Sequence, residues 1–251
     1  MGAADDRSVL PRFGMRGRCG HAMRIQTSVN SRLAGWSCLA VALLATAPAF
    51  AKPIAFQGGT TVMAEYGAGT MIEGQIFYAP SYRWSTGLGH LRLEADDESF
   101  SREITYARVN LLVARRNRPQ SQGNLFTWTG LGGADSSDVQ RQQVALNAGG
   151  QADYETLRFY SSLRTDWHYS TANFSHRIDT AQLGWAPYPH NWDRLATWVV
   201  VQGRNFTGGL YDDIEGAVLL RFFRNGRSRA IWVEAGVTQD GRLQSMLMIN
   251  F

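Results

Sequence analysis

The chain has 251 residues, with 25 Lys or Arg and 21 Asp or Glu, a formal net charge of +4. The excess of basic residues is confined to the start of the chain, where six basic and two acidic residues precede residue 52. Residues 52–251 therefore contain 19 basic and 19 acidic residues. That neutral balance, with Lys52 as the single lysine, argues against nucleic-acid binding, and the positions of Cys19 and Cys38 exclude thiol chemistry after residue 51.

A signal peptide is predicted at residues 23–51. Its start carries two arginines, an apolar stretch follows, and Ala49-Phe50-Ala51 forms a small-x-small cleavage motif. The apolar stretch has about 15 residues, fewer than the roughly 20 that a membrane-spanning helix needs, so we expect cleavage rather than anchoring.

Residues 1–22 are polar and patternless, and we interpret them as a misassigned start or an extension. The folded part is then 52–251, in an exported protein.

After residue 52 apolar and polar residues alternate with period two, the pattern of a β-strand with one apolar face. In the stretch 157–170, for example, Leu163 and Trp167 alternate with Arg164, Asp166 and His168. Turn-forming residues separate such runs, and Asp240-Gly241 predicts a type I′ hairpin turn. We predict twelve strands, with ten as the alternative if 122–133 and 139–152 are not strands: 60–67, 70–79, 82–95, 100–115, 122–133, 139–152, 155–169, 173–187, 194–205, 212–224, 229–239 and 242–251.

Two all-β architectures fit this pattern. A soluble periplasmic β-domain would turn the apolar faces inward, whereas a transmembrane antiparallel up-and-down β-barrel would turn them outward to lipid. Many predicted strands have 10 to 15 residues, which suits tilted membrane strands better than the average strand of a soluble protein. Aromatic residues such as Tyr78, Trp84 and Trp185 gather near strand ends, as in interfacial girdles. These observations favour the membrane barrel.

The last predicted strand supports the same architecture. Leu243, Leu247, Ile249 and Phe251 share one face of it, and Phe251 is the final residue. A closing amphipathic strand that ends in phenylalanine resembles the assembly signal of bacterial outer-membrane β-barrel proteins. This resemblance implies an even number of strands, both termini in the periplasm, a place in outer-membrane lipid, and recognition of the last strand by the barrel-assembly machinery.

With the apolar faces outward, the charged faces line the lumen. In the strand at 82–95 this assignment puts Leu91 and Leu93 outside and the charged residues inside. The predicted lumen-lining residues are Glu65, Glu73, Arg92, Glu94, Arg108, Arg158, Arg164, Asp166, His168, Glu215, Arg221 and Glu234. Buried charges need partners, so we expect ion pairs across strands in a narrow barrel.

An enzyme is the alternative function class. The segment from His168 to Asn173 faintly resembles the His-x-Ser-Asn motif of outer-membrane phospholipases and lipid A deacylases, which would make His168 the base and Ser170 the nucleophile. Thr171 stands where the asparagine belongs, and the alternation turns both residues to the lumen, away from lipid. We therefore expect no catalytic residues, no metal site and no cofactor. The predicted function is a small outer-membrane barrel, either a narrow pore for small polar solutes or a structural membrane protein.

Overall fold

Twelve antiparallel strands form one closed sheet in the computed structural model, which describes residues 56–171, 174–189, 195–226 and 229–251. The signal peptide and the segment before it lie outside the described residues. In chain order the strands are β1 (Gly59–Gly67), β2 (Met71–Ser81), β3 (Trp84–Glu94), β4 (Ser101–Arg118), β5 (Ser121–Ser136), β6 (Val139–Thr156), β7 (Phe159–Ser170), β8 (Ser175–Trp185), β9 (Ala196–Phe206), β10 (Ile214–Asn225), β11 (Ala230–Thr238) and β12 (Leu243–Asn250).

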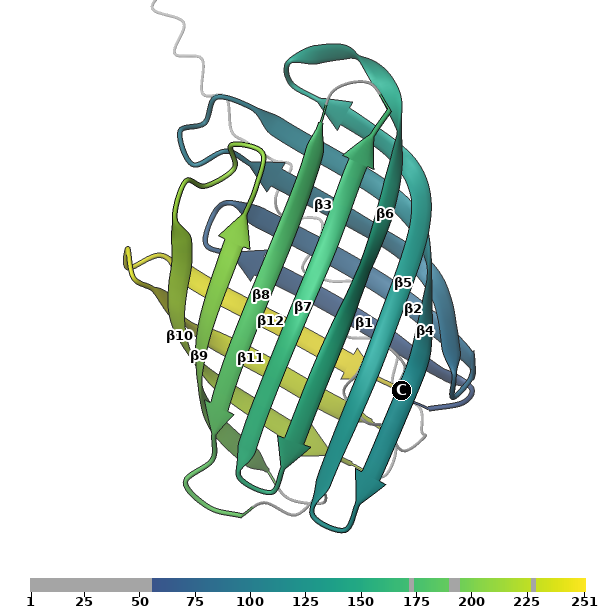
Figure 1. Cartoon of the computed structure of the whole chain (residues 1–251), viewed down its shortest axis with the longest axis vertical. Helices are drawn as coiled ribbons and strands as arrows, with labels where there is room; N and C mark the ends of the chain where they lie inside the picture. The colour runs from purple at the N-terminus through teal and green to yellow at the C-terminus, as the bar shows by residue number, and fades with distance from the viewer. Residues whose placement is uncertain (1–55, 172–173, 190–194, 227–228) are drawn as a thin grey trace, which may run out of the picture. The chain divides into compact units, whose positions relative to one another are not determined.

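The twelve-stranded, up-and-down barrel predicted from the sequence is confirmed. Each strand pairs with its neighbours in the chain, and β1 pairs with β12 to close the sheet. Figure 1 shows the resulting tilt, with the strands of the front wall crossing those of the back wall at a large angle. No helix among the described residues is long and apolar enough to cross a membrane.

The last residue takes part in the closure of the barrel. Phe251 donates its backbone N–H to the Thr60 carbonyl at 2.9 Å and accepts a hydrogen bond from the Thr60 N–H at 2.7 Å. The chain therefore ends inside the ladder that joins β12 to β1. We call the end of the barrel that holds this junction the proximal end, and the opposite end the distal end.

The turn at the distal end of β11 differs from the predicted one. Only Gly241 of the Asp240-Gly241 pair has positive φ, at 74°, and Thr238 N–H bonds to the Arg242 carbonyl at 2.9 Å, so the loop is one residue longer than a type I′ turn. The type I′ pattern is found instead between β1 and β2, where Ala68 has φ 53° and Gly69 has φ 95°.

Strands β4, β5 and β6 are the longest of the barrel, with 18, 16 and 18 residues. The β4–β5 register shifts between Leu112 and Ala114, and residues 113–118 beyond this bulge are exposed on both faces. A bulge bends the strand that carries it. Strand β4 therefore has no lumen face beyond the bulge, whereas Asn124 of β5 is buried there and donates a hydrogen bond to Asp153 at 2.6 Å.

Candidate functional site

The outer wall of the barrel is apolar over most of its height. Leu163, Leu183 and Val201 are 66%, 68% and 59% exposed, so large aliphatic side chains face outward from neighbouring strands. Exposed aromatic residues mark the two edges of this surface. Tyr66, Trp167 and Tyr169 lie towards the distal end, and Tyr78, Tyr82, Trp84, Phe159 and Trp185 lie towards the proximal end.

The inner wall carries most of the charged residues expected in the lumen. Glu73, Arg108, Asp166, His168, Glu215, Arg221 and Glu234 are buried inside the barrel, and the side chains of Glu65 and Arg164 are 9% and 22% exposed there.

Three predicted lumen residues lie elsewhere. Arg92 and Glu94 are on the outward face of β3, where Arg92 contacts Glu94 at 3.0 Å and Glu103 at 3.6 Å, and Arg158 is exposed in the turn between β6 and β7. The expected orientation of β3 was wrong, because Leu91 and Leu93 are fully buried inside the barrel.

Arg164 is the centre of the first ion-pair network. It contacts three carboxylates: Glu65 at 3.9 Å, Glu73 at 3.4 Å, and Asp166, to which its Nε donates a hydrogen bond. Arg204 donates to Glu65 from the opposite wall. Strands β1, β2, β7 and β9 are thereby joined across the lumen.

Arg108 extends the network towards β4 and β5. Its Nη1 lies 3.8 Å from Asp166, and its Nη2 donates to Gln75 at 2.9 Å. Trp128 donates its indole N–H to the same aspartate at 2.9 Å. With three arginines and three carboxylates, the network is formally neutral, and its charges are paired as buried charges require.

Tyr106 connects this network to the wall of the barrel. Its hydroxyl donates to Glu73 and accepts from Gln75 at 3.0 Å. The ring lies over Gly89 of β3, where an added Cβ would be 2.3 Å from Tyr106 Cζ. Glycine at this position therefore makes room for the tyrosine.

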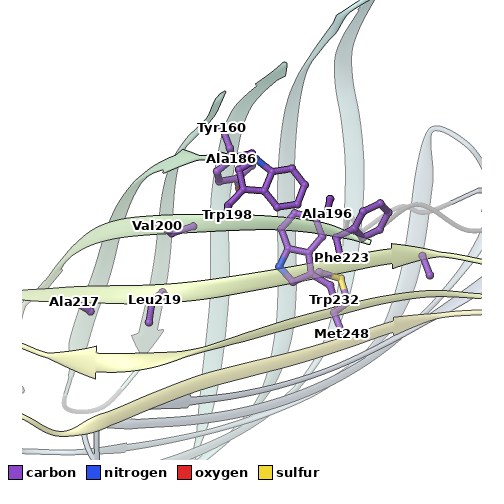
Figure 2. Packing of buried hydrophobic residues seen from close by; sticks show 11 residues of the cluster. Tyr160, Ala186, Ala196, Trp198, Val200, Ala217, Leu219, Phe223, Trp232 and Met248 are labelled. Atoms are coloured by element: carbon purple, nitrogen blue, oxygen red, sulfur yellow. The ribbon is translucent and has the colours of Figure 1, made fainter. Parts of the chain in front are cut away.

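A second network lies nearer the proximal end. Arg221 donates to Glu234 at 2.8 Å and to Gln182 at 2.7 Å, and its guanidinium lies 4.1 Å from the Tyr160 ring centroid and 4.6 Å from that of Trp232. Tyr160 and Trp232 belong to the buried cluster shown in Figure 2, in which Trp198 and Trp232 stack with ring centroids 6.4 Å apart. The arginine is thus held by both charge and aromatic faces.

A cavity of about 110 Å³ lies between the two networks. Its wall includes charged residues of both, together with a set of side-chain amides and aromatic rings. The amides are Gln75, Gln151, Gln182, Gln202 and Gln244, and the rings are Phe77, Trp128, Tyr160 and Trp232. The cavity is narrow, has both polar and apolar side chains in its wall, and is built from nearly every strand of the barrel.

The distal mouth is filled by apolar side chains. Leu91, Leu93, Ile104, Phe206 and Leu210 belong to one buried cluster there, and Leu210 is fully buried although it lies in the loop between β9 and β10. The carbonyl of Leu210 accepts a hydrogen bond from the Asp96 N–H at 2.9 Å, which ties this loop to the loop after β3. In this conformation the loop covers the distal end of the lumen.

Arg204 is the main lumen residue that sequence reasoning missed. The strand that carries it reads Val199-Val200-Val201 before Gln202, so neither face of its first half is polar and no inner face was assigned. The alternation of Gln202 and Arg204 is the signal that could have found it.

His168 and Ser170 both face the lumen. His168 is 1% exposed, and the Ser170 hydroxyl donates to Gln143. Both side chains therefore lie on the inner side of the barrel wall, away from its apolar outer surface. Among the described residues, no group of three or more His, Cys, Asp or Glu side chains is arranged to hold a metal ion.

These features define a class: a closed twelve-stranded antiparallel barrel with an apolar outer wall and a lumen of paired charges. No protein-family model matches the sequence, and a search of curated proteins finds no match.

Solved structures with a similar fold share little sequence with the chain. A KdgM porin in complex with disordered oligogalacturonate has 10% identity and a TM-score of 0.44, and a second KdgM porin structure has 8% and 0.43; each comparison covers 77% of this chain and 98% of the porin. CdiB from Acinetobacter baumannii has 8% identity and a TM-score of 0.30 over 78% of this chain and 60% of its own.

Proposed function

We propose that the chain is an outer-membrane β-barrel that forms a narrow pore for small polar solutes. The main support is the difference between the two surfaces of the barrel wall. Aliphatic residues such as Leu163 and Leu183 face outward, whereas the inner surface holds a cavity between two ion-pair networks. A soluble domain rarely exposes so continuous an apolar surface, whereas lipid requires it. The proximal end, where β1 begins and β12 ends, would face the periplasm, and β12 would be the strand that the assembly machinery recognises.

The buried side chain of Leu210, in the β9–β10 loop, makes the described conformation a closed one. Because Leu210 and its apolar neighbours fill the distal mouth, solute passage requires this loop to move. The ion-pair networks would then set selectivity, since a permeating solute must pass Arg164, Arg204 and their carboxylates.

Planar-bilayer recording of the refolded protein tests the proposal. We expect discrete conductance steps, with folding verified by the difference in gel migration between heated and unheated samples. A folded barrel without conductance under any applied voltage would contradict the pore. It would favour the second candidate, a structural membrane protein, for which the filled distal mouth is the specific observation.

The lipid-hydrolase alternative is tested separately. It requires His168 and Ser170 to reach an acyl ester, and both side chains are buried on the lumen side. We expect no lipid deacylation by the wild-type protein. Deacylation that is lost in Ser170→Ala would restore this alternative.

A further inference from the structure

The exposed arginines at the two ends of the barrel differ in their partners. At the distal end, Arg92 contacts Glu94 at 3.0 Å and Arg177 contacts Asp179 at 2.8 Å. At the proximal end, five exposed arginines contact no carboxylate of the described residues, and we call them the arginine rim: Arg83, Arg116, Arg118, Arg158 and Arg224. The rim therefore carries exposed positive charge for which the described residues supply no counter-charge.

The arginine rim lies directly beyond the proximal aromatic edge. Arg83 stands between Tyr82 and Trp84, and Arg158 precedes Phe159. Exposed tyrosine and tryptophan rings of membrane proteins lie at the level of the lipid headgroups. Arginines next to these rings are therefore at the level of the phosphates, where one guanidinium can donate two parallel hydrogen bonds to the same phosphate.

Three of the five arginines continue the outward face of the wall. Beyond the β4 bulge, Arg116 and Arg118 lie on the same face as Leu125 of the paired strand, which is 43% exposed. Arg224 follows Phe222 on the outward face of β10. A soluble partner that approaches along the barrel axis meets the turns, whereas lipid surrounds the outward face. The outward position of these side chains therefore favours lipid as the source of the negative charge.

An apolar groove of about 440 Å³ adjoins the rim on the outer wall. Side chains of β7, β8 and β9 line it, among them Phe159, Leu183, Trp185, Val199 and Val201. The carbonyl of Arg158 accepts a hydrogen bond from the Ala186 N–H at 2.7 Å, so this arginine lies at the proximal end of the groove. An acyl chain in the groove would place its headgroup beside Arg158.

We propose that the arginine rim binds phospholipids whose headgroups carry a net negative charge. The phosphates contact the guanidinium groups, and the acyl chains lie against the apolar outer wall. The attraction of several arginines to an anionic membrane surface adds up, and salt screens it. This inference goes beyond the proposed pore: it requires that the barrel lies in a bilayer, and it does not require that the barrel conducts.

The experiment inserts the full chain into phosphatidylcholine vesicles in which about a third of the lipid is phosphatidylglycerol. The barrel is extracted in mild detergent, and the lipids that it retains are measured by mass spectrometry. At low salt we expect phosphatidylglycerol to be enriched over phosphatidylcholine at least about threefold relative to the vesicle. The enrichment should disappear in about 1 M NaCl, where the screening length is about 3 Å. Equal retention of the two lipids at low salt would overturn the proposal.

Paired variants locate the lipid contact. Arg116→Gln with Arg118→Gln removes two charges of the rim and should lower the enrichment at least about twofold. Arg92→Gln with Arg177→Gln makes the same change in charge on the outward face of the distal end and should leave the enrichment unchanged. Residues 1–51 are identical in all the proteins compared, so their arginines do not contribute to the difference. Equal enrichment in all three folded proteins would overturn the site.

Two further outcomes separate this inference from its neighbours. Polyglutamate that binds the barrel in phosphatidylcholine vesicles through Arg116 and Arg118, without any preference for phosphatidylglycerol, would assign the rim to an acidic protein and overturn the proposal. Conductance in planar bilayers without lipid enrichment would refute this inference and keep the pore, and enrichment without conductance would do the reverse.

Discussion

Arg221 and Glu234 face each other across β10 and β11 as a buried ion pair, with Arg221 Nη2 2.7 Å from Glu234 Oε1. Replacing only Arg221 with Met would leave Glu234 buried without its cation, which costs about 3–5 kcal/mol of unfolding free energy. Replacing both residues with Met should recover most of that loss, because neither member of this pair is then left buried without its partner. Urea unfolding in detergent, followed by the heat-dependent gel shift, measures both. The ion-pair interpretation would be contradicted if the double variant lost as much unfolding free energy as Arg221→Met and Glu234→Met lose when added together.

Leu210 closes the distal mouth, and its replacement should open the lumen. In Leu210→Ser a buried apolar side chain of the β9–β10 loop becomes polar, so the loop loses its packing against Phe206 and Ile104. We expect a higher fraction of open time in planar-bilayer recordings. Asp212→Ser, an exposed change in the same loop, serves as the control and should behave like the wild type. Unchanged gating in Leu210→Ser would refute a role of this loop as the closure.

Asp138, in the turn between β5 and β6, predicts a pH dependence at the distal end. Hydrogen bonds from Ser136 and Arg102 hold the pKa of Asp138 below its ordinary value, with Arg102 Nη1 at 2.7 Å and Nη2 at 2.9 Å. The depressed pKa means that the contact stabilises the fold above the ordinary pKa of aspartate, about 3.9, and is lost as pH falls through the lower, folded value.

The expected effect on stability is small, because the Asp138 side chain is 46% exposed and solvent screens its ion pair with Arg102. Wild-type melting temperature should be insensitive to this contact from pH 7 to 5 and should fall below about pH 4. Asp138→Asn should show a slightly lower melting temperature at pH 7 and a shallower acid decline. An identical acid decline in the two proteins would show that Asp138 is not the responsible group.

The outer wall predicts a depth-dependent response to charge. Leu163 is 66% exposed on the outward face of β7, away from both aromatic edges, so Leu163→Arg should destabilise the lipid-inserted barrel by about 2–4 kcal/mol. Ser161→Arg, nearer the proximal edge of the same strand, should cost only about 0–1 kcal/mol. Unfolding titrations in lipid vesicles measure the difference. Equal effects at the two positions would mean that this face does not contact hydrocarbon.

The strands were predictable because side chains of a strand alternate strictly between two faces. All twelve were placed within a few residues, and the faces of β7 and β10 followed directly from Trp167 against Asp166 and Leu220 against Arg221. The sequence also predicts an exported leader ahead of the body of the chain, and this prediction lies outside the described residues.

Which face of β3 points inward was decided by the tertiary structure. Its alternation puts Leu91 and Leu93 on one face and Arg92 and Glu94 on the other, and the rule of polar residues inside assigns the wrong one. The distal lumen is filled by an apolar cluster drawn from strands far apart in the sequence, so leucines fit inside there, while Arg92 pairs with Glu94 and Glu103 outside.

The cavity, too, forms only when the barrel closes. Period two places Arg164 on one face with Asp166, and Arg204 on one face with Gln202, but it holds no information about which carboxylate lies across the lumen. Arg204 meets Glu65 across 139 positions of sequence, and Arg164 meets Glu73 across 91. Local alternation therefore determines the strands of this protein, whereas the ion pairs, the amide-lined cavity and the closed distal mouth exist only because β12 returns to pair with β1.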